Sequence, residues 1–102
     1  MAMADENPEI ERLDWDDWNR ERIAKPGVGP SQVEEAVIGE TVAQPTYKRR
    51  FLVLGLTHTG KLLTVVIGPV PGQAGAYYTF SARPASRSER RFYQRVKASE
   101  EQ

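Results

Sequence analysis

The hydrophobic and polar positions of this chain fall into segments with different periods, and each period predicts one kind of element. Apolar residues alternate through residues 48–56 and 61–67 and again from Tyr77. This alternation predicts three β-strands, because successive side chains of a strand point to opposite faces. The first of these strands has apolar residues on both faces and is therefore expected to be central. Residues 10–15 can form a fourth, shorter strand.

Two short helices are expected in the N-terminal half. The first begins after one of three aspartates that can cap it and ends near Lys25, because Pro26-Gly27 stops a helix. The second begins at Ser31, where Ser31 and Glu34 form the S-x-x-E pattern of a capping box, and it stops at Gly39. The three candidate capping residues of the first helix are Asp14, Asp16 and Asp17.

The last strand leads directly into a third helix. Strict alternation places Tyr78 and Phe80 on one face of the strand and Tyr77, Thr79 and Ser81 on the other. The order of expected elements is therefore β-α-α-β-β-β-α. This order predicts an α+β fold in which two N-terminal helices and one C-terminal helix pack on an antiparallel sheet of three to four strands.

The third helix has a clear start and two different faces. Pro84 ends the strand because proline has no N–H for the ladder, and Ser86 with Glu89 forms a second S-x-x-E pattern. Phe92 and Tyr93 are expected to face the core. The opposite face carries the basic side chains Arg87, Arg90, Arg91, Arg95 and Lys97.

Length and composition indicate a single domain. The 102 residues suit one modest core, expected over residues 10–98 with disordered tails at 1–9 and 99–102. The chain has no cysteine, which excludes disulfides and thiolate–zinc sites. No apolar run reaches the length of a membrane span, and the first residues lack the pattern of a signal peptide. We therefore expect a cytoplasmic protein without a membrane partner.

The net charge of zero hides a strong asymmetry. Residues 1–40 contain eleven Asp/Glu against four Lys/Arg, a net charge of −7. Residues 41–102 contain ten Lys/Arg against three Asp/Glu, a net charge of +7. We favour a basic face for an anionic partner over a chance asymmetry that folding cancels.

Arg83 stands at the joint between the last strand and the third helix, where we expect it to meet an anionic partner. Its planar guanidinium matches a phosphate group bidentately. Glu89 and Tyr93 lie four residues apart on one helix face, so both are candidates for proton transfer to and from RNA. The alternative is that Glu89 only caps the helix, Tyr93 only packs in the core and the helical arginines only form a solvated face.

A second basic cluster, Tyr47-Lys48-Arg49-Arg50, opens the first of the three long strands. An aromatic residue among basic ones suits contacts with a nucleic-acid backbone and with stacked bases. Strict alternation places Lys48 and Arg50 on one face. The alternative is a charge cluster on an edge strand that blocks aggregation.

The remaining chemistry-bearing residues predict structural roles. Trp15 and Trp18 are expected in the core rather than on a stacking platform. The single histidine, His58, has no carboxylate neighbour in the sequence and is expected in an exposed turn. We therefore predict no metal site and no cofactor.

Three groups of residues then stand out by their order along the chain. They are Trp15-Asp16, Asn19, Ile23-Ala24, Gly27-Val28, Pro30 and Glu34-Glu35; then Arg50-Phe51-Leu52, Gly55, Gly60-Lys61-Leu62-Leu63 and Val65-Val66; then Ser81-Ala82-Arg83, Ala85, Glu89-Arg90-Arg91 and Tyr93. Together, over about residues 13–93, these groups resemble the pattern of the BrnT-type toxin family.

The resemblance implies a compact RelE-like fold and a metal-independent endoribonuclease toxin that inhibits translation and arrests growth. It also implies a partner, a small BrnA-like antitoxin that covers the basic surface, with operator DNA bound only by the toxin–antitoxin complex. Basic residues would hold the RNA, namely Lys48, Arg50, Arg87, Arg90 and Arg91.

Two positions depart from the family pattern. Arg22 and Pro26 stand where that pattern has histidines. Arginine stays protonated and proline cannot titrate, so neither replaces a histidine in proton transfer. Either catalysis is lost and the protein is a degenerate toxin that acts as an antitoxin-binding or transcription-regulatory subunit, or other side chains perform it. Those side chains would be Arg83, Glu89, Tyr93 and Lys25.

Overall fold

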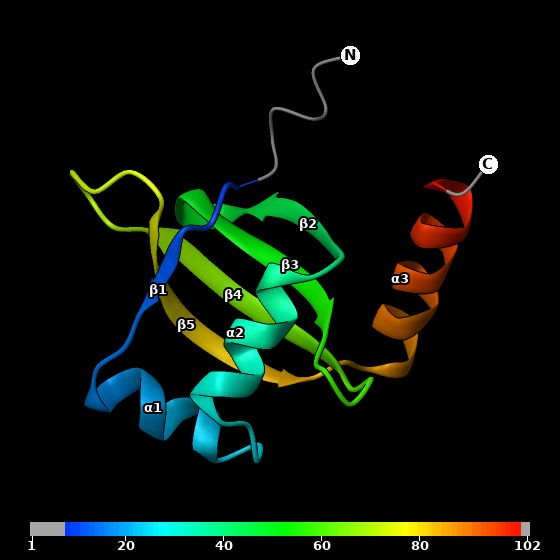
Figure 1. Cartoon of the computed structure of the whole chain (residues 1–102), viewed down its shortest axis with the longest axis horizontal. Helices are drawn as coiled ribbons and strands as arrows, with labels where there is room; N and C mark the ends of the chain where they lie inside the picture. The colour runs from blue at the N-terminus through cyan, green and yellow to red at the C-terminus, as the bar shows by residue number, and fades with distance from the viewer. Residues whose placement is uncertain (1–7, 101–102) are drawn as a thin grey trace.

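Alternating apolar residues in the second half of the chain form the centre of a mixed β-sheet. Strands β3 (Arg50–Leu56), β4 (Leu62–Pro69) and β5 (Ala76–Pro84) pair antiparallel. On one edge β2 (Thr41–Thr46) pairs antiparallel with β3, and on the other β1 (Arg12–Asp14) pairs parallel with β5. The strand order is therefore β1-β5-β4-β3-β2 (Figure 1). The structure is a computed structural model, and it describes residues 8–100.

The α+β class is confirmed, but the sheet differs from the prediction in two respects. It contains five strands among the described residues, and the pairing of β1 makes it mixed rather than antiparallel. The sequence hid β2 because Val42 and Ala43 are adjacent apolar residues and Pro45 lacks an N–H. Its position at the edge tolerates Pro45, because only one side of an edge strand is paired. The element order is thus β-α-α-β-β-β-β-α.

Helix α1 (Asp17–Ala24) has the expected kind of cap. Asp16 Oδ1 accepts the backbone N–H of Asn19 at 3.0 Å, and Asn19 Oδ1 accepts the backbone N–H of Asp16 at 2.8 Å. Asn19 Nδ2 also donates to the carbonyl of Asp14 at 3.0 Å. The fully buried amide of Asn19 therefore connects the end of β1 to the start of α1.

Replacement of Asn19 by alanine is expected to lower the free energy of unfolding by about 2 kcal/mol, since it removes the buried amide that bonds the Asp16 N–H and the Asp14 carbonyl and leaves both part-buried groups unpaired. Urea unfolding monitored by circular dichroism measures this loss. Gln32→Ala is the matched control, because Gln32 Oε1 accepts only one N–H, that of Gly29, at 3.0 Å in a half-buried position. An equal loss in the two variants would show that the buried amide has no special role.

Helix α2 (Pro30–Ile38) begins one residue earlier than predicted. Pro30 starts the first turn, where its fixed φ suits the helix and its missing N–H costs nothing. Gln32 rather than Glu34 therefore reaches back to the cap residue, so the predicted Ser31–Glu34 capping box was wrong. Glu34 instead accepts the indole N–H of Trp15 at 3.0 Å.

Helix α3 (Arg87–Glu100) starts as predicted. Ser86 Oγ accepts the N–H of Glu89 at 3.2 Å, and Glu89 Oε1 accepts the N–H of Ser86 at 2.8 Å. The helix continues to Glu100, two residues into the segment 99–102 that was expected to be a tail. Most of the expected N-terminal tail, residues 1–7 of 1–9, lies outside the described residues, as do residues 101–102.

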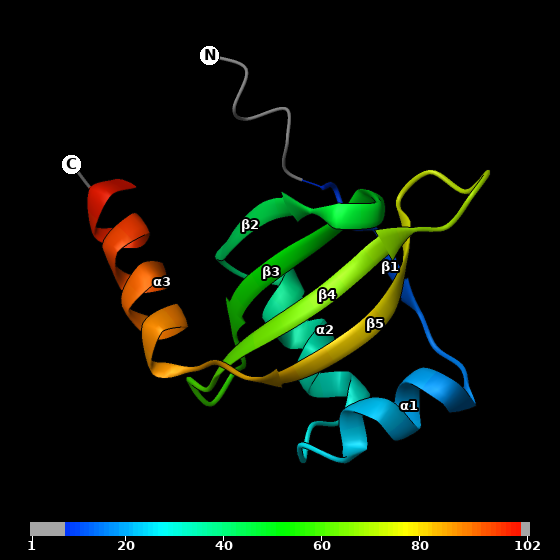
Figure 2. The same ribbon diagram turned by 180° about the vertical axis from the view of Figure 1, so that it is seen from behind.

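The sheet has a covered face and a partly open one. Helix α2 crosses the first face over a core that contains Ile23, Val33, Leu63, Val65 and Ile67, all fully buried (Figure 1). The second face carries a smaller core, which includes Leu54, Leu62 and Tyr93. Figure 2 shows this second face: α3 stands beside β2 and β3, and β4 and β5 are left uncovered by any helix of residues 8–100.

A β-bulge in β5 decides which side chains reach the open face. Ile67 pairs with Thr79, but the neighbouring Val66 pairs with Ser81, so Phe80 is an extra residue in β5. The bulge reverses the alternation after Phe80. Ser81 therefore lies on the face opposite Thr79, which corrects the prediction that the two share a face. Arg83, which pairs with Thr64, is placed on the open face by the same shift.

The start of β3 also departs from simple alternation. Lys48 and Arg49 have φ values of 62° and 60°, within a short 3₁₀ turn over Tyr47–Arg49. The predicted strand 48–56 therefore begins at Arg50, and the prediction that Lys48 and Arg50 share a strand face was wrong.

Among residues 8–100, no helix is both long and apolar enough to cross a membrane.

Candidate functional site

Arg83 and Glu89 form a bidentate ion pair where β5 leads into α3. Arg83 Nη1 donates to Glu89 Oε1 and Nη2 donates to Oε2, both at 2.8 Å. Glu89 Oε1 also accepts the hydroxyl of the buried Thr64 at 2.8 Å and the N–H of Ser86 at 2.8 Å. The Arg83 hydrogen bonds, and then those from Ser86 and Thr64, lower the pKa of Glu89 from 4.5 to about 2, although burial opposes the shift. Glu89 is therefore ionised at neutral pH, and both of its carboxylate oxygens accept hydrogen bonds.

Tyr93 is buried and packs between α3 and the sheet. Its ring is 7% exposed, and its hydroxyl donates to the backbone carbonyl of Glu40 at 2.9 Å. Burial raises the pKa of this hydroxyl above its usual value. Tyr93 therefore connects α3 to the start of β2, and neither Tyr93 nor Glu89 presents a free group for proton transfer.

A hollow of about 500 Å³ lies between α1 and the end of β5. Two of the residues predicted from the sequence to be catalytic line it. Lys25 reaches it from the end of α1, and Arg83 reaches it from β5. Glu21, Arg22 and Trp18 line it as well. The hollow therefore combines three cations, one carboxylate and one aromatic ring.

Trp18 corrects the prediction that both tryptophans are core residues. Trp15 is half-buried and packs against the first core, but Trp18 is 54% exposed. The guanidinium carbon of Arg22 lies 5.2 Å from the centre of the Trp18 ring. The i, i+4 spacing of these two residues was the available signal, because it places both on one side of a helix.

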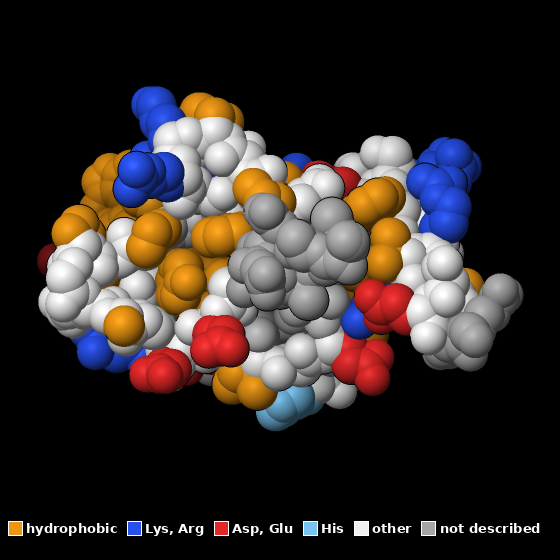
Figure 3. Space-filling view, turned by 90° about the horizontal axis from the view of Figure 1, so that it is seen from above, with side chains coloured by type: hydrophobic (Ala, Val, Ile, Leu, Met, Phe, Trp, Pro, Cys, Tyr) orange, Lys and Arg blue, Asp and Glu red, His pale blue; other side chains and the backbone are white. Residues whose placement is uncertain are grey.

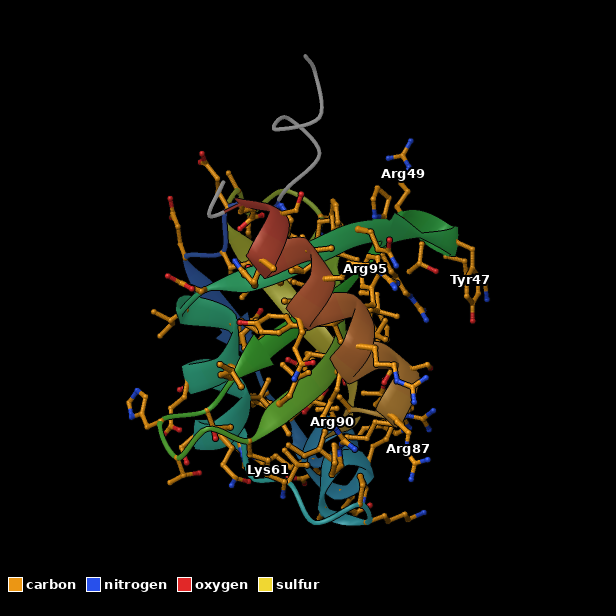
Figure 4. All side chains as sticks on the ribbon, turned by 90° about the vertical axis from the view of Figure 1, so that its right-hand side faces the viewer. Tyr47, Arg49, Lys61, Arg87, Arg90 and Arg95 are labelled. Atoms are coloured by element: carbon orange, nitrogen blue, oxygen red, sulfur yellow. The ribbon has the colours of Figure 1, made fainter. Side chains whose placement is uncertain are left out.

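The arginines of α3 do not converge on Arg83. Figure 4 shows Arg87, Arg90 and Arg95 spaced along α3 rather than gathered around one point. Arg90 Nη1 donates to the carbonyl of Ala85 at 3.0 Å. The side chains of Arg87 and Arg91 are exposed. Arg83 and the arginines of α3 therefore do not form one phosphate-binding site.

The predicted cluster of Lys48 and Arg50 lies in a different place. With Arg49 it lines a second, wider hollow of about 940 Å³, beside the loop between β4 and β5. The Arg50 guanidinium carbon lies 3.6 Å from the centre of the Phe80 ring. Seen from above, basic side chains lie at separate places around the molecule, and one group of them is on the side of α3 (Figure 3). The basic half of the sequence thus forms several sites rather than one.

His58 occupies the exposed hairpin between β3 and β4, as predicted. The sequence did not reveal its carboxylate neighbour: Glu35 Oε1 accepts the N–H of His58 at 3.0 Å, and Glu35 Oε2 lies 3.6 Å from Nδ1. Within residues 8–100, no three His, Cys, Asp or Glu side chains are grouped so that they could hold a metal ion.

The hollow beside Arg83 can bind a phosphate group flanked by a base. Guanidinium groups match phosphate oxygens in pairs, and an exposed indole offers a stacking surface.

Compared with known proteins, the chain matches no family model, no curated protein and no solved structure.

Proposed function

We propose that this protein is the toxin component of a toxin–antitoxin pair and cleaves RNA without a metal ion in the hollow between α1 and β5. The observation that carries the proposal is the meeting of Arg22, Lys25 and Arg83 beside the exposed Trp18. The resemblance of residues 13–93 to BrnT-type toxins supports it independently, because Arg83 belongs to the closing group of that pattern.

The proposed reaction is an attack of the RNA 2′-oxygen on the adjacent phosphorus. The 2′-hydroxyl proton goes to Glu21, the new O–P bond forms, and the bond to the 5′-oxygen breaks. Arg83 and Arg22 stabilise the charge on the phosphorane, and Lys25 gives a proton to the leaving oxygen. The product strand ends in a 2′,3′-cyclic phosphate. Glu89 acts by holding Arg83, so it is a positioning residue in this scheme.

The test is incubation of RNA with the purified, antitoxin-free protein in a chelating buffer. We expect strands that end in a cyclic phosphate, and Arg83→Ala and Glu21→Gln are each expected to slow cleavage at least tenfold. Lys61→Ala is the charge control, because Lys61 lies in the hairpin between β3 and β4 and does not line the hollow. Cleavage that is unchanged in Arg83→Ala would place the active site elsewhere.

A second candidate function is non-catalytic, and two observations favour it. Glu89 and Tyr93 are both committed to internal hydrogen bonds, and Arg22 and Pro26 stand where the family pattern has histidines. A degenerate toxin of this kind would bind its antitoxin and regulate transcription as part of the complex. Intact RNA and normal growth after induced expression, together with a stable antitoxin complex, would support this function over the first.

The proposed antitoxin would bind on the side of α3. A groove between α3 and the sheet has an apolar floor of Leu52, Leu54 and Phe92, with Gln44, Ser88 and Glu89 also lining it, and α3 carries exposed arginines. An apolar groove beside basic side chains suits an amphipathic segment with acidic residues. Operator DNA would be bound only by the toxin–antitoxin complex, as in the family that the sequence resembles.

A further inference from the structure

Five flat side chains form a continuous strip on the open side of the molecule. The Arg22 guanidinium lies over Trp18, and the Trp18 and Tyr78 rings stack at 6.4 Å with an interplanar angle of 30°. The Tyr78 and Phe80 rings meet edge to face at 5.0 Å, and Arg50 lies over Phe80 at 3.6 Å. We name this row Arg22–Trp18–Tyr78–Phe80–Arg50 the aromatic strip.

The strip depends on the alternation of β5 and on one glycine of β4. Regular alternation up to Phe80 places it on the same face as Tyr78, the face that α3 leaves uncovered, and their rings are in contact. Gly68 lies directly under Phe80, because a Cβ atom at this position would come within 2.8 Å of the Phe80 ring. Two aromatic residues of β5 and the space left by one glycine of β4 thus create an aromatic surface on this face.

The strip is held in place at its centre. The Tyr78 hydroxyl donates to both carboxylate oxygens of Asp16, at 2.9 and 3.0 Å. Burial and this bond to Asp16 raise the pKa of Tyr78 to about 12, so the ring stays neutral. A ring that is fixed before binding loses little conformational freedom when a ligand stacks on it.

The two ends of the strip lie in the two basic hollows. Arg22 and Trp18 line the hollow that contains Arg83. Arg50 and Phe80 line the hollow that contains Lys48 and Arg49, together with the carboxylates of Glu9 and Glu11. The charges therefore lie at both ends and the rings lie between them.

We propose that the aromatic strip binds single-stranded RNA and guides it from the Arg83 hollow to the hollow of Lys48 and Arg50. Bases would stack on the exposed Trp18 and on the outer face of the Arg50 guanidinium, which the Phe80 ring supports, while phosphates meet basic groups at both ends. The inference rests on the proposed function in one respect, namely that RNA is the substrate. It adds that the substrate must be single-stranded, because bases in a duplex are stacked on each other.

The test uses a 2′-O-methyl oligouridine as the probe, which cannot be cleaved by attack of its 2′-oxygen. Binding can therefore be measured whether or not the protein is catalytic. We expect Trp18→Ala to weaken binding about fivefold or more, since stacking contributes about 1–3 kcal/mol per base. Phe80→Leu is also expected to weaken binding, because it removes the ring that supports the Arg50 guanidinium. Trp18→Phe keeps a ring and should restore most of the affinity. Arg50→Gln should weaken binding and reduce its dependence on salt.

Ile38→Ala is the matched control, because Ile38 is 79% exposed and belongs to α2, on the other face of the sheet. It should bind the probe as the unchanged protein does. Circular dichroism of each variant shows whether it is folded. If a strip variant fails to fold, binding is measured instead by the fluorescence of Trp18 in a Trp15→Phe variant, in which Trp18 is the single tryptophan. We expect the probe to quench this fluorescence.

The possible outcomes separate the strip from the cleavage reaction. Weaker binding in the strip variants supports the strip, even if the unchanged protein cleaves no RNA. Equal binding in all variants, or equal binding of single-stranded and duplex probe, overturns the strip, while RNA cleavage that depends on Arg83 would still stand. Loss of antitoxin binding with unchanged RNA binding also overturns it and assigns the strip to a protein partner. No binding of any probe by the unchanged protein overturns both proposals.

Discussion

Gly55→Ala is expected to lower the free energy of unfolding by about 3 kcal/mol or more, at the upper end of the cost of overpacking a core. Gly55 lies in β3 beneath α2, and a Cβ atom there would be 2.0 Å from the carbonyl oxygen of Ala36. It would also be 3.2 Å from Cγ2 of Thr41. The obstacle is helix backbone, which cannot move aside as a flexible side chain could.

Urea unfolding followed by circular dichroism measures this effect. Gly39→Ala is the matched control at the end of α2, because the nearest atom to its added Cβ is 3.9 Å away and its φ is −79°. The control should change stability by less than about 1 kcal/mol. If Gly55→Ala were as stable as Gly39→Ala, α2 could not lie as close to β3 as the structure places it.

Glu89→Gln is expected to lower the free energy of unfolding by about 2 kcal/mol at neutral pH, a value that allows for partial exposure of the ion pair. The amide keeps the size of the carboxylate but loses its charge. It therefore weakens the bonds to Arg83, to the Ser86 N–H and to the Thr64 hydroxyl together.

The pH dependence gives this prediction a second measurement. The pKa of Glu89 is about 2 in the folded protein and near 4.5 when the chain is unfolded, so the unfolded state takes up the proton first as acid is added. The ion pair therefore contributes fully above pH 4.5, and its contribution disappears as the pH falls toward 2. The difference in stability between the unchanged protein and Glu89→Gln should shrink over this range.

Glu100→Gln is the control for the pH series. Glu100 pairs with Lys97 at 3.2 Å, but its side chain is 57% exposed, so its loss should change stability by less than about 0.5 kcal/mol. A stability difference between the unchanged protein and Glu89→Gln that persists unchanged at pH 2 would contradict the assignment of the stabilisation to this ion pair.

The Arg83–Glu89 ion pair changes the roles that the sequence suggested for these two residues. Arg83 and Glu89 were identified from the sequence as an anion-binding arginine and a proton-transfer group or cap. In the structure the Glu89 carboxylate is the partner of the Arg83 guanidinium. Glu89 therefore caps α3 through the Ser86 N–H and holds the Arg83 side chain in place. The remaining N–H groups of Arg83 and the adjoining Arg22 and Lys25 are what the hollow offers to a phosphate group.

Local signals in the sequence determined the elements that have a local cause. Alternation identified the three long strands, the Ser86–Glu89 pattern identified the start of α3, and the aspartates near residue 16 identified the cap of α1. Each depends on contacts between residues a few positions apart. The α+β class followed from these elements, because amphipathic helices must cover a sheet.

The tertiary structure decided the features that depend on contacts between distant segments. The parallel pairing of β1 with β5, the edge strand β2 and the bulge at Phe80 each arise from partners far along the chain. The bulge in turn reversed the face of Arg83, and the exposure of Trp18 depends on how α1 meets β5. Composition and alternation describe one segment at a time, so they place basic and aromatic residues on a strand or helix. Only packing between segments determines which of them meet.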